Sequence, residues 1–148
     1  MQLCICGPKE FVMTVKKLAA LLLTLVLAAA LCSCGGNVSD VMRIVPPSEL
    51  YNSESINDAM DVVVRYFRKE FEGCKLTWLI YDESRAEAFD EWAAQYGADE
   101  AIVLLSTFEV SERGGDGSLE PGQLYTNWQW ILTRDAGGAW QLQTWGYG

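Results

Sequence analysis

The sequence predicts a small domain of the α+β class that follows an N-terminal export signal. Three observations carry this prediction. An uncharged apolar run occupies residues 18–31. Two segments with helical periodicity come next, and segments rich in β-branched and aromatic residues fill most of the remainder. Early helices followed by consecutive strands favour a helical layer packed on a mainly antiparallel sheet.

The apolar run is too short to be a typical membrane span. Its fourteen residues, 18–31, are Leu, Ala and Val with a single threonine, and Lys16 and Lys17 precede them. A helix of this length covers about 21 Å, less than the ~30 Å hydrocarbon core. A short apolar run after a basic start is typical of a signal peptide. Residues 1–12 contain an acidic residue where a basic stretch is expected, so we expect translation to start at Met13.

The end of this run, Leu31-Cys32-Ser33-Cys34, resembles the lipobox of bacterial lipoproteins. Cys34 fits the modified position, because small Ser33 precedes it and Leu31 stands three residues before it. Cys32 does not fit, because Leu31 would take the small position. The resemblance implies a signal peptide over residues 1–33 and lipidation of Cys34, which would anchor the domain at the outer face of the cytoplasmic membrane. An ordinary secretory signal or an uncleaved anchor is the alternative.

The chain from Cys34 onward has the size of one domain and is strongly acidic. It carries eight Lys or Arg against nineteen Asp or Glu, a net charge of −11. Such a surface repels phosphate backbones and anionic headgroups. We therefore expect no nucleic-acid partner, and we expect the lipid anchor to supply the contact with the membrane.

The sequence contains no histidine, which excludes Ser-His and Cys-His nucleophiles and removes the commonest metal ligand. After processing, only Cys34 and Cys74 remain, and Cys34 is expected to carry lipid. We therefore expect no intramolecular disulfide, no metal site and no cofactor. Cys74 begins an apolar strand and is expected to be a buried small residue.

Residues 34–52, rich in Gly, Ser and Pro, are expected to form a tether, and residues 53–148 the globular domain. The first helix is predicted to begin at Ser55, a plausible N-cap with an acidic residue three positions later. It is predicted to end at Gly73. Its apolar residues follow one helical face: Ile56, Met60, Val63, Phe67 and Phe71.

A second helix is predicted between Ser84, which opens a capping box with Glu87, and Gly97. Four segments have strand composition: residues 74–81, 101–110, 124–134 and 139–145. The last two are predicted to form a hairpin through a turn at residues 135–138. A polar, glycine-rich loop covers residues 111–122.

This order of elements resembles the cystatin/NTF2-like group, in which a curved sheet wraps a long N-terminal helix. For residues 53–148 the resemblance implies a curved, mainly antiparallel four-stranded sheet with both helices packed on it. The phrases YTNWQWIL and WGYG, together with the lipobox, resemble small uncharacterised lipoproteins of clostridial bacteria. No function follows from that second resemblance.

The six tryptophans all lie after Cys34, on predicted strands or the second helix. Trp128 and Trp130 are expected on one face of their strand, with Trp140 opposite them across the hairpin. One interpretation is a packed core. The other is an aromatic platform for a sugar, a cell-wall glycan or a peptide. The candidate ligand-binding residues are Trp128, Trp130, Trp140 and Tyr125.

Acidic residues near predicted strand ends are candidates for proton transfer or glycoside hydrolysis: Asp82, Glu83 and Glu109, with Tyr81 and Tyr125 as hydrogen-bond donors. No spacing singles out a pair, so solvated charges are the simpler interpretation. The loop 114–120 suggests calcium, but it offers only Asp116 and Glu120 as acidic ligands, too few for an EF-hand.

We therefore expect a membrane-anchored extracytoplasmic lipoprotein that acts as a non-catalytic binding or accessory module in the cell envelope. Its ligand would be an envelope protein, a peptide or a glycan. One alternative is an NTF2-like enzyme of isomerase or hydrolase type that uses pocket carboxylates. Another is an inhibitor or stress protein that pairs a free edge of strand 101–110 or 124–134 with its partner.

Overall fold

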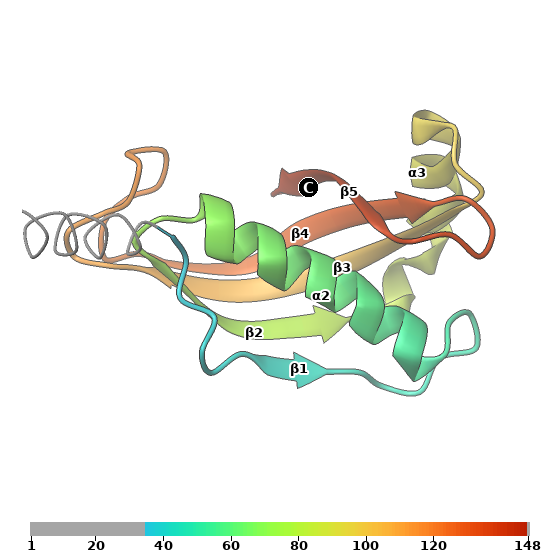
Figure 1. The fold of residues 1–148 in the computed structure, drawn as a ribbon, viewed down its shortest axis with the longest axis horizontal. Coiled ribbons are helices and arrows are strands. Elements are labelled where there is room, and N and C mark those ends of the chain that lie inside the picture. The colour runs from blue at the N-terminus through green and yellow to red at the C-terminus, as the bar shows by residue number, and fades with distance from the viewer. Residues whose placement is uncertain (1–34, 148) are drawn as a thin grey trace, which may run out of the picture. The chain divides into compact units, whose positions relative to one another are not determined.

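Five strands form one mixed, open sheet in the computed structural model, which describes residues 35–147 (Figure 1). The strand order is β1-β2-β3-β4-β5; β1 runs parallel to β2 and all other neighbours are antiparallel. The predicted signal peptide and Cys34 lie outside the described residues. The strands are β1 (Met42–Ile44), β2 (Cys74–Tyr81), β3 (Glu100–Val110), β4 (Leu124–Arg134) and β5 (Gln141–Gly146).

The α+β class is confirmed, but the expected four-stranded sheet is wrong because β1 adds a fifth strand. β1 comes from the segment expected to be a tether, and it places Met42 opposite Trp78. Arg43 also forms an ion pair with Asp61, at 2.7 Å. Three residues are too few to show the alternating pattern of a strand. The sequence therefore did not indicate that this segment pairs with β2.

Helix α2 (Ser53–Glu70) crosses one face of the sheet (Figure 1). It begins two residues before the predicted cap, because the Asn52 side chain accepts a hydrogen bond from the Ser55 N–H at 2.8 Å. The predicted apolar face is the buried one, and Phe71 caps the C-terminal end. Four side chains of this face are at most 1% exposed: Ile56, Met60, Val63 and Phe67.

The second helical segment consists of a 3-10 turn, η1 (Glu83–Ala88), followed by helix α3 (Phe89–Tyr96). Asp82 caps η1 instead of the predicted Ser84, because its carboxylate accepts the Ser84 N–H at 3.0 Å. Gly97, with φ 65°, ends α3 as predicted. α3 packs against β3 and β4 through buried Phe89 and Ala93.

β3 and β4 lie inside the sheet, each with a strand partner on both sides. The sheet edges are β1 and β5, so a free edge of strand 101–110 or 124–134, which would favour the inhibitor or stress-protein alternative, is limited to the ends of β3 and β4 that the β2 and β5 ladders do not reach. Both faces of β3 are buried over residues 101–104. This matches its continuous apolar run.

The β4–β5 register corrects the expected tryptophan pairing, because Trp145, not Trp140, stands opposite Trp130. β5 begins at Gln141, so Trp140 precedes the strand. Its indole turns onto α2, where Nε1–H donates to the Ser55 carbonyl at 2.9 Å. That hydrogen bond satisfies the donor of a buried indole.

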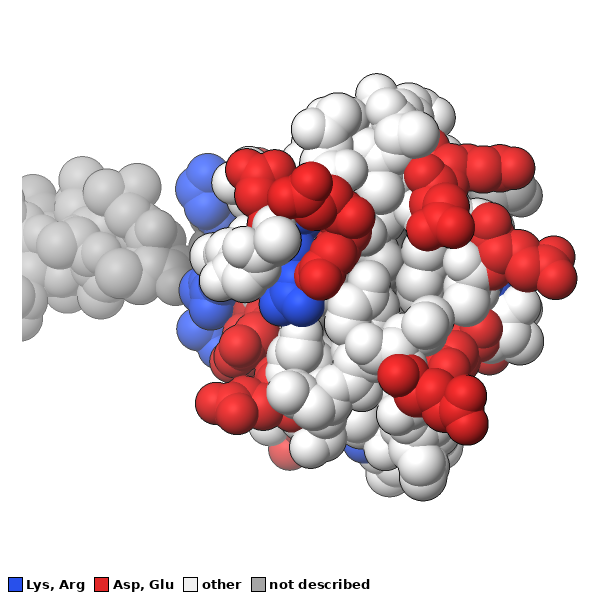
Figure 2. All heavy atoms as spheres, turned by 90° about the vertical axis from the view of Figure 1, so that its right-hand side faces the viewer, with Lys and Arg blue, Asp and Glu red and all other residues white. Residues whose placement is uncertain are grey.

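Charge on the described surface is mainly acidic. Figure 2, which views the domain from the end where α3 lies, shows red side chains scattered over the face and outnumbering blue ones. Within residues 35–147, none of the helices combines the length and the apolar character needed to span a membrane.

Candidate binding site

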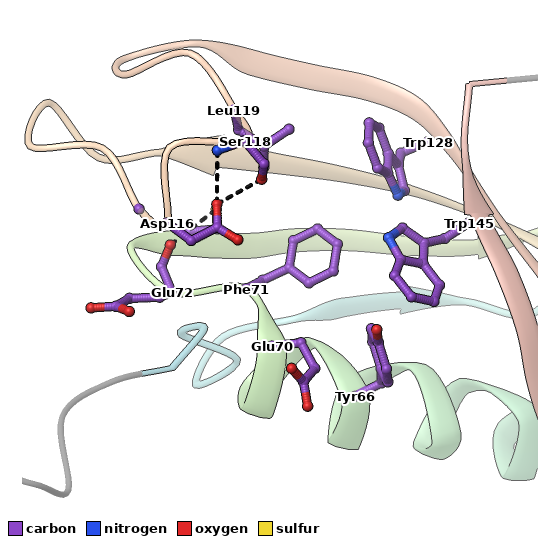
Figure 3. Close-up of a pocket in the computed structure, with 11 residues that line it drawn as sticks. Tyr66, Glu70, Phe71, Glu72, Asp116, Ser118, Leu119, Trp128 and Trp145 are labelled. Atoms are coloured by element: carbon purple, nitrogen blue, oxygen red, sulfur yellow. Dashed lines mark hydrogen bonds between the residues drawn. The ribbon is translucent and has the colours of Figure 1, made fainter.

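A cavity of about 350 Å³ opens between the C-terminal end of α2, the loop after β3, and strands β4 and β5 (Figure 3). We call it the aromatic pocket. Eleven residues line it: Tyr66, Glu70, Phe71, Glu72, Cys74, Gly115, Asp116, Ser118, Leu119, Trp128 and Trp145. It lies on the side of the sheet that α2 covers, and its volume suits a small ligand or one side chain of a larger one.

Four aromatic rings form the walls of the aromatic pocket. Phe71 and Trp128 stand perpendicular, with ring centroids 6.4 Å apart. Tyr66 approaches Trp145 with a centroid distance of 4.6 Å. Trp145 is 41% exposed, so its ring borders solvent as well as the pocket.

A bulge in β4 places Trp128 in this wall. Opposite β3, Phe108 pairs with Tyr125 and Ser106 with Trp128, so β4 holds one extra residue between the two pairs. Asn127, inside the bulge, has a φ of 56°. Strict alternation would put Tyr125 and Trp128 on opposite faces. The bulge instead brings both to the side of α2.

The Trp128 indole N–H is buried and has no hydrogen-bond partner within the described part of the chain. Figure 3 shows the nitrogen-bearing edges of Trp128 and Trp145 turned toward one another. A buried donor without an acceptor costs roughly 1–3 kcal/mol. Such a donor beside a cavity is therefore a feature that a ligand oxygen would satisfy.

The polar part of the lining is acidic. Its acidic residues are Glu70, Glu72 and Asp116, with the Glu72 carboxylate turned away from the cavity (Figure 3), and none of the eleven lining residues is Lys or Arg. Glu70 forms an ion pair with its exposed neighbour Lys69, at 2.6 Å. Asp116 accepts hydrogen bonds from the Ser118 N–H at 2.9 Å and from its hydroxyl at 2.6 Å. These bonds lower the pKa of Asp116 and keep it ionised.

Two glycines dock the loop after β3 against the turn between α2 and β2. A Cβ on Gly73, whose φ is 71°, would lie 2.2 Å from the Gly114 carbonyl oxygen. A Cβ on Gly115 would lie 2.0 Å from the Glu72 carbonyl oxygen. The loop's far end is held by Tyr125, whose hydroxyl accepts the Glu120 N–H at 3.1 Å. This docking brings Asp116 over the pocket.

Three lining groups have shifted pKa values, and each shift moves away from neutrality. Burial raises the pKa of the Cys74 thiol to about 11. Burial also raises the pKa of Tyr66, and the Ser118 hydrogen bonds lower that of Asp116. A general acid or base works best with a pKa near the operating pH. None of the three shifts brings a group toward that range, and a protonated Cys74 is a poor nucleophile.

Of the four predicted ligand-binding residues, only Trp128 lines the aromatic pocket. Trp130 is fully buried beneath it and donates to the Ser106 hydroxyl at 2.8 Å. Tyr125 stacks on Phe108 with a centroid distance of 5.1 Å, next to Trp128 but outside the lining. Trp140 lies elsewhere.

Trp140 belongs to a separate cluster at the other end of α2. The Arg134 guanidinium lies 4.2 Å from its ring centroid, and Tyr51 meets it edge to face at 5.4 Å. Arg134 also pairs with Glu100. This arrangement joins β4, α2 and the segment before α2, and Trp140 and Arg134 also line a second, smaller cavity of about 200 Å³ there.

The structure does not bring the predicted carboxylates together. Asp82 caps η1, and Glu83 lies beside the Tyr81 hydroxyl at 3.4 Å. Glu109 stands opposite Lys75, at the far end of the β2–β3 ladder. Among the described residues, no group of three His, Cys, Asp or Glu side chains is arranged as a metal site.

Sequence reasoning missed Tyr66, Phe71 and Trp145 as site residues. A signal for Tyr66 was present, because Tyr66 and Glu70 are four apart and lie on one side of a helix. Trp145 depends on the β4–β5 register. Comparisons with protein-family models, with curated proteins and with solved structures find no match to this chain. The pocket geometry is therefore the basis for a functional proposal.

Proposed function

We propose that the chain is a membrane-anchored extracytoplasmic lipoprotein whose domain binds a ligand in the aromatic pocket, as a non-catalytic binding or accessory module of the cell envelope. One observation supports this most directly: a cavity of about 350 Å³ walled by aromatic rings, with the unpaired Trp128 N–H beside it. Pockets with apolar walls and a few polar groups are the usual form of a ligand site.

The proposed arrangement of the domain is cystatin-like. In support, α2 precedes the four antiparallel strands β2 to β5 in the chain and lies across the sheet that they form. η1 and α3 are inserted between β2 and β3, and β1 is added at the edge. A likeness of this kind concerns the arrangement of elements and names no ligand.

Binding is tested by the indole Nε1–H signals of the ¹⁵N-labelled full chain in a non-ionic detergent. The probes are chitotriose, a tri-lysine peptide and choline. We expect at least one of them to shift the Trp128 and Trp145 signals and to leave Trp78 unchanged, since Trp78 pairs with Met42 outside the pocket. If no probe shifts the pocket signals, or if Trp78 shifts equally, the proposal is wrong.

The anchor is tested separately in cells. We expect Cys34→Ala to release the domain from the membrane fraction and to abolish incorporation of radiolabelled lipid. Cys32→Ala is the matched control, because the lipobox pattern excludes Cys32, and it should remain membrane-bound. Retention of the Cys34→Ala chain would contradict the proposed lipidation.

A further inference from the structure

We propose that the aromatic pocket selects a small organic ammonium that carries a hydroxyl or carbonyl oxygen, over neutral and anionic ligands of the same shape. This inference rests on the proposed function and names the chemistry of its ligand. Three independent features of the lining support it: its charge, the faces of its rings, and its unpaired donor.

The charge of the lining is complementary to a cation. Glu70 and Asp116 are exposed acidic residues of the lining, the Glu72 carboxylate points away from the cavity (Figure 3), and Lys and Arg are missing among the lining residues. Lys69 reaches Glu70 from an exposed position, with its side chain 81% accessible, so it weakens this field without entering the lining. An anionic ligand would meet the like charges of Glu70 and Asp116 and would have no basic partner in the lining.

The ring faces add a second attraction for the same group. A cation within about 6 Å of a ring centroid is attracted by the ring quadrupole, most strongly for Trp. Trp128 and Trp145 both line the cavity, with Phe71 and Tyr66 beside them. An alkylated ammonium fits such walls better than a hydrated metal ion, because its carbon atoms bury apolar area while its charge is retained.

The Trp128 N–H adds a requirement that a bare cation does not meet. It is a donor, it is buried, and it lacks an acceptor within residues 35–147. An oxygen on the ligand would satisfy it, at about 2.9 Å for an N–H···O bond. The ligand therefore needs an acceptor close to its ammonium, as in amino alcohols or amino sugars.

Choline and 3,3-dimethylbutan-1-ol test this inference as a matched pair. They share shape and hydroxyl group, and differ in having a charged nitrogen or a neutral carbon at the branch point. With the full chain, followed by the Trp128 and Trp145 indole signals, we expect choline to bind about tenfold more tightly. We also expect this preference to shrink as salt is added.

Two charge-neutralising variants probe the carboxylates. We expect Glu70→Gln and Asp116→Asn each to lower choline affinity about threefold and to leave the neutral alcohol unchanged. Asn at position 116 keeps an oxygen that can accept from Ser118, so the loop turn is retained. Glu109→Gln, an exposed carboxylate outside the pocket, is the matched control and should change neither affinity.

Equal binding of the two probes would overturn the charge selectivity and leave the proposed binding site standing. Binding of choline that is unaffected by Glu70→Gln and Asp116→Asn would also overturn it. If neither probe shifts the pocket signals, the ammonium assignment is wrong. The proposed function then fails only if chitotriose and tri-lysine leave the same signals unchanged.

Discussion

The buried hydrogen bond between Trp130 and Ser106 gives the sharpest test of how the core is stabilised. The Trp130 side chain is 0% exposed and Ser106 is 1% exposed. The indole Nε1–H donates to the Ser106 hydroxyl oxygen at 2.8 Å. Ser106→Ala removes that acceptor and leaves almost no cavity, because a single oxygen atom is lost. The indole N–H then stays buried without a partner.

The cost of that change follows from the desolvated donor. An unsatisfied buried N–H costs about 1–3 kcal/mol, and each 1 kcal/mol lowers the Tm of a domain of this size by about 4 °C. We expect Ser106→Ala to lower the free energy of unfolding by about 1–3 kcal/mol. Urea denaturation followed by circular dichroism measures this loss. Ser53→Ala, at an exposed position on the first turn of α2, is the control and should change stability by less than ~0.5 kcal/mol.

A double-mutant cycle separates the hydrogen bond from other effects of Ser106→Ala. In a Trp130→Phe background the indole donor is absent, so Ser106→Ala should cost about 1–2 kcal/mol less than in the wild type. The reasoning is refuted if Ser106→Ala costs the same in both backgrounds, or no more than Ser53→Ala in the wild type.

Three further predictions concern the backbone, a thiol and pH. Gly73→Ala should destabilise the domain more than Gly97→Ala. Both residues have φ near 70°, but only at Gly73 would a Cβ meet a backbone carbonyl. Equal losses of stability in urea denaturation would contradict this. Cys74 is 4% exposed, and burial raises its pKa to about 11. Iodoacetamide at pH 8.5 should therefore alkylate it far more slowly in the native chain than in urea, as measured by peptide mass spectrometry. Similar alkylation rates would be inconsistent with its burial. Burial raises the pKa of Tyr51 to about 12 from 10.0, so the folded state favours the neutral phenol. This contribution is complete below pH 10 and is lost as the pH rises toward 12. Urea denaturation between pH 8 and 11.5 should therefore show a steeper loss of stability in the wild type than in Tyr51→Phe, and parallel curves would show that Tyr51 is not responsible.

Most helices and strands were predictable because their signals are local. The apolar spacing of α2, the continuous apolar run of β3 and the turn between β4 and β5 each depend on residues near in sequence. The caps moved from Ser55 to Asn52 and from Ser84 to Asp82, by three and two residues, because neighbouring polar side chains compete for the same N–H groups.

The aromatic pocket was not predictable in the same way, because its walls come from segments far apart in the chain. Trp128 reaches it through a bulge at Asn127, and Trp145 through the β4–β5 register. Asp116 reaches it because Gly73 and Gly115 allow two backbone segments to touch. Composition indicates an aromatic, acidic domain, but it does not indicate which rings share a cavity.

By itself, the sequence determined the α+β class, the order of the main elements, the acidic charge and the prediction of a lipid anchor at Cys34. These follow from periodicity, composition and a short motif, all of which act over a few residues. The tertiary structure alone decided that β1 closes onto β2, that Trp140 packs on α2, and that Trp128 and Trp145 face one cavity. Those outcomes depend on strand register, a single bulged residue and the docking of a loop, which are settled only when distant segments compete for the same space and the same hydrogen bonds.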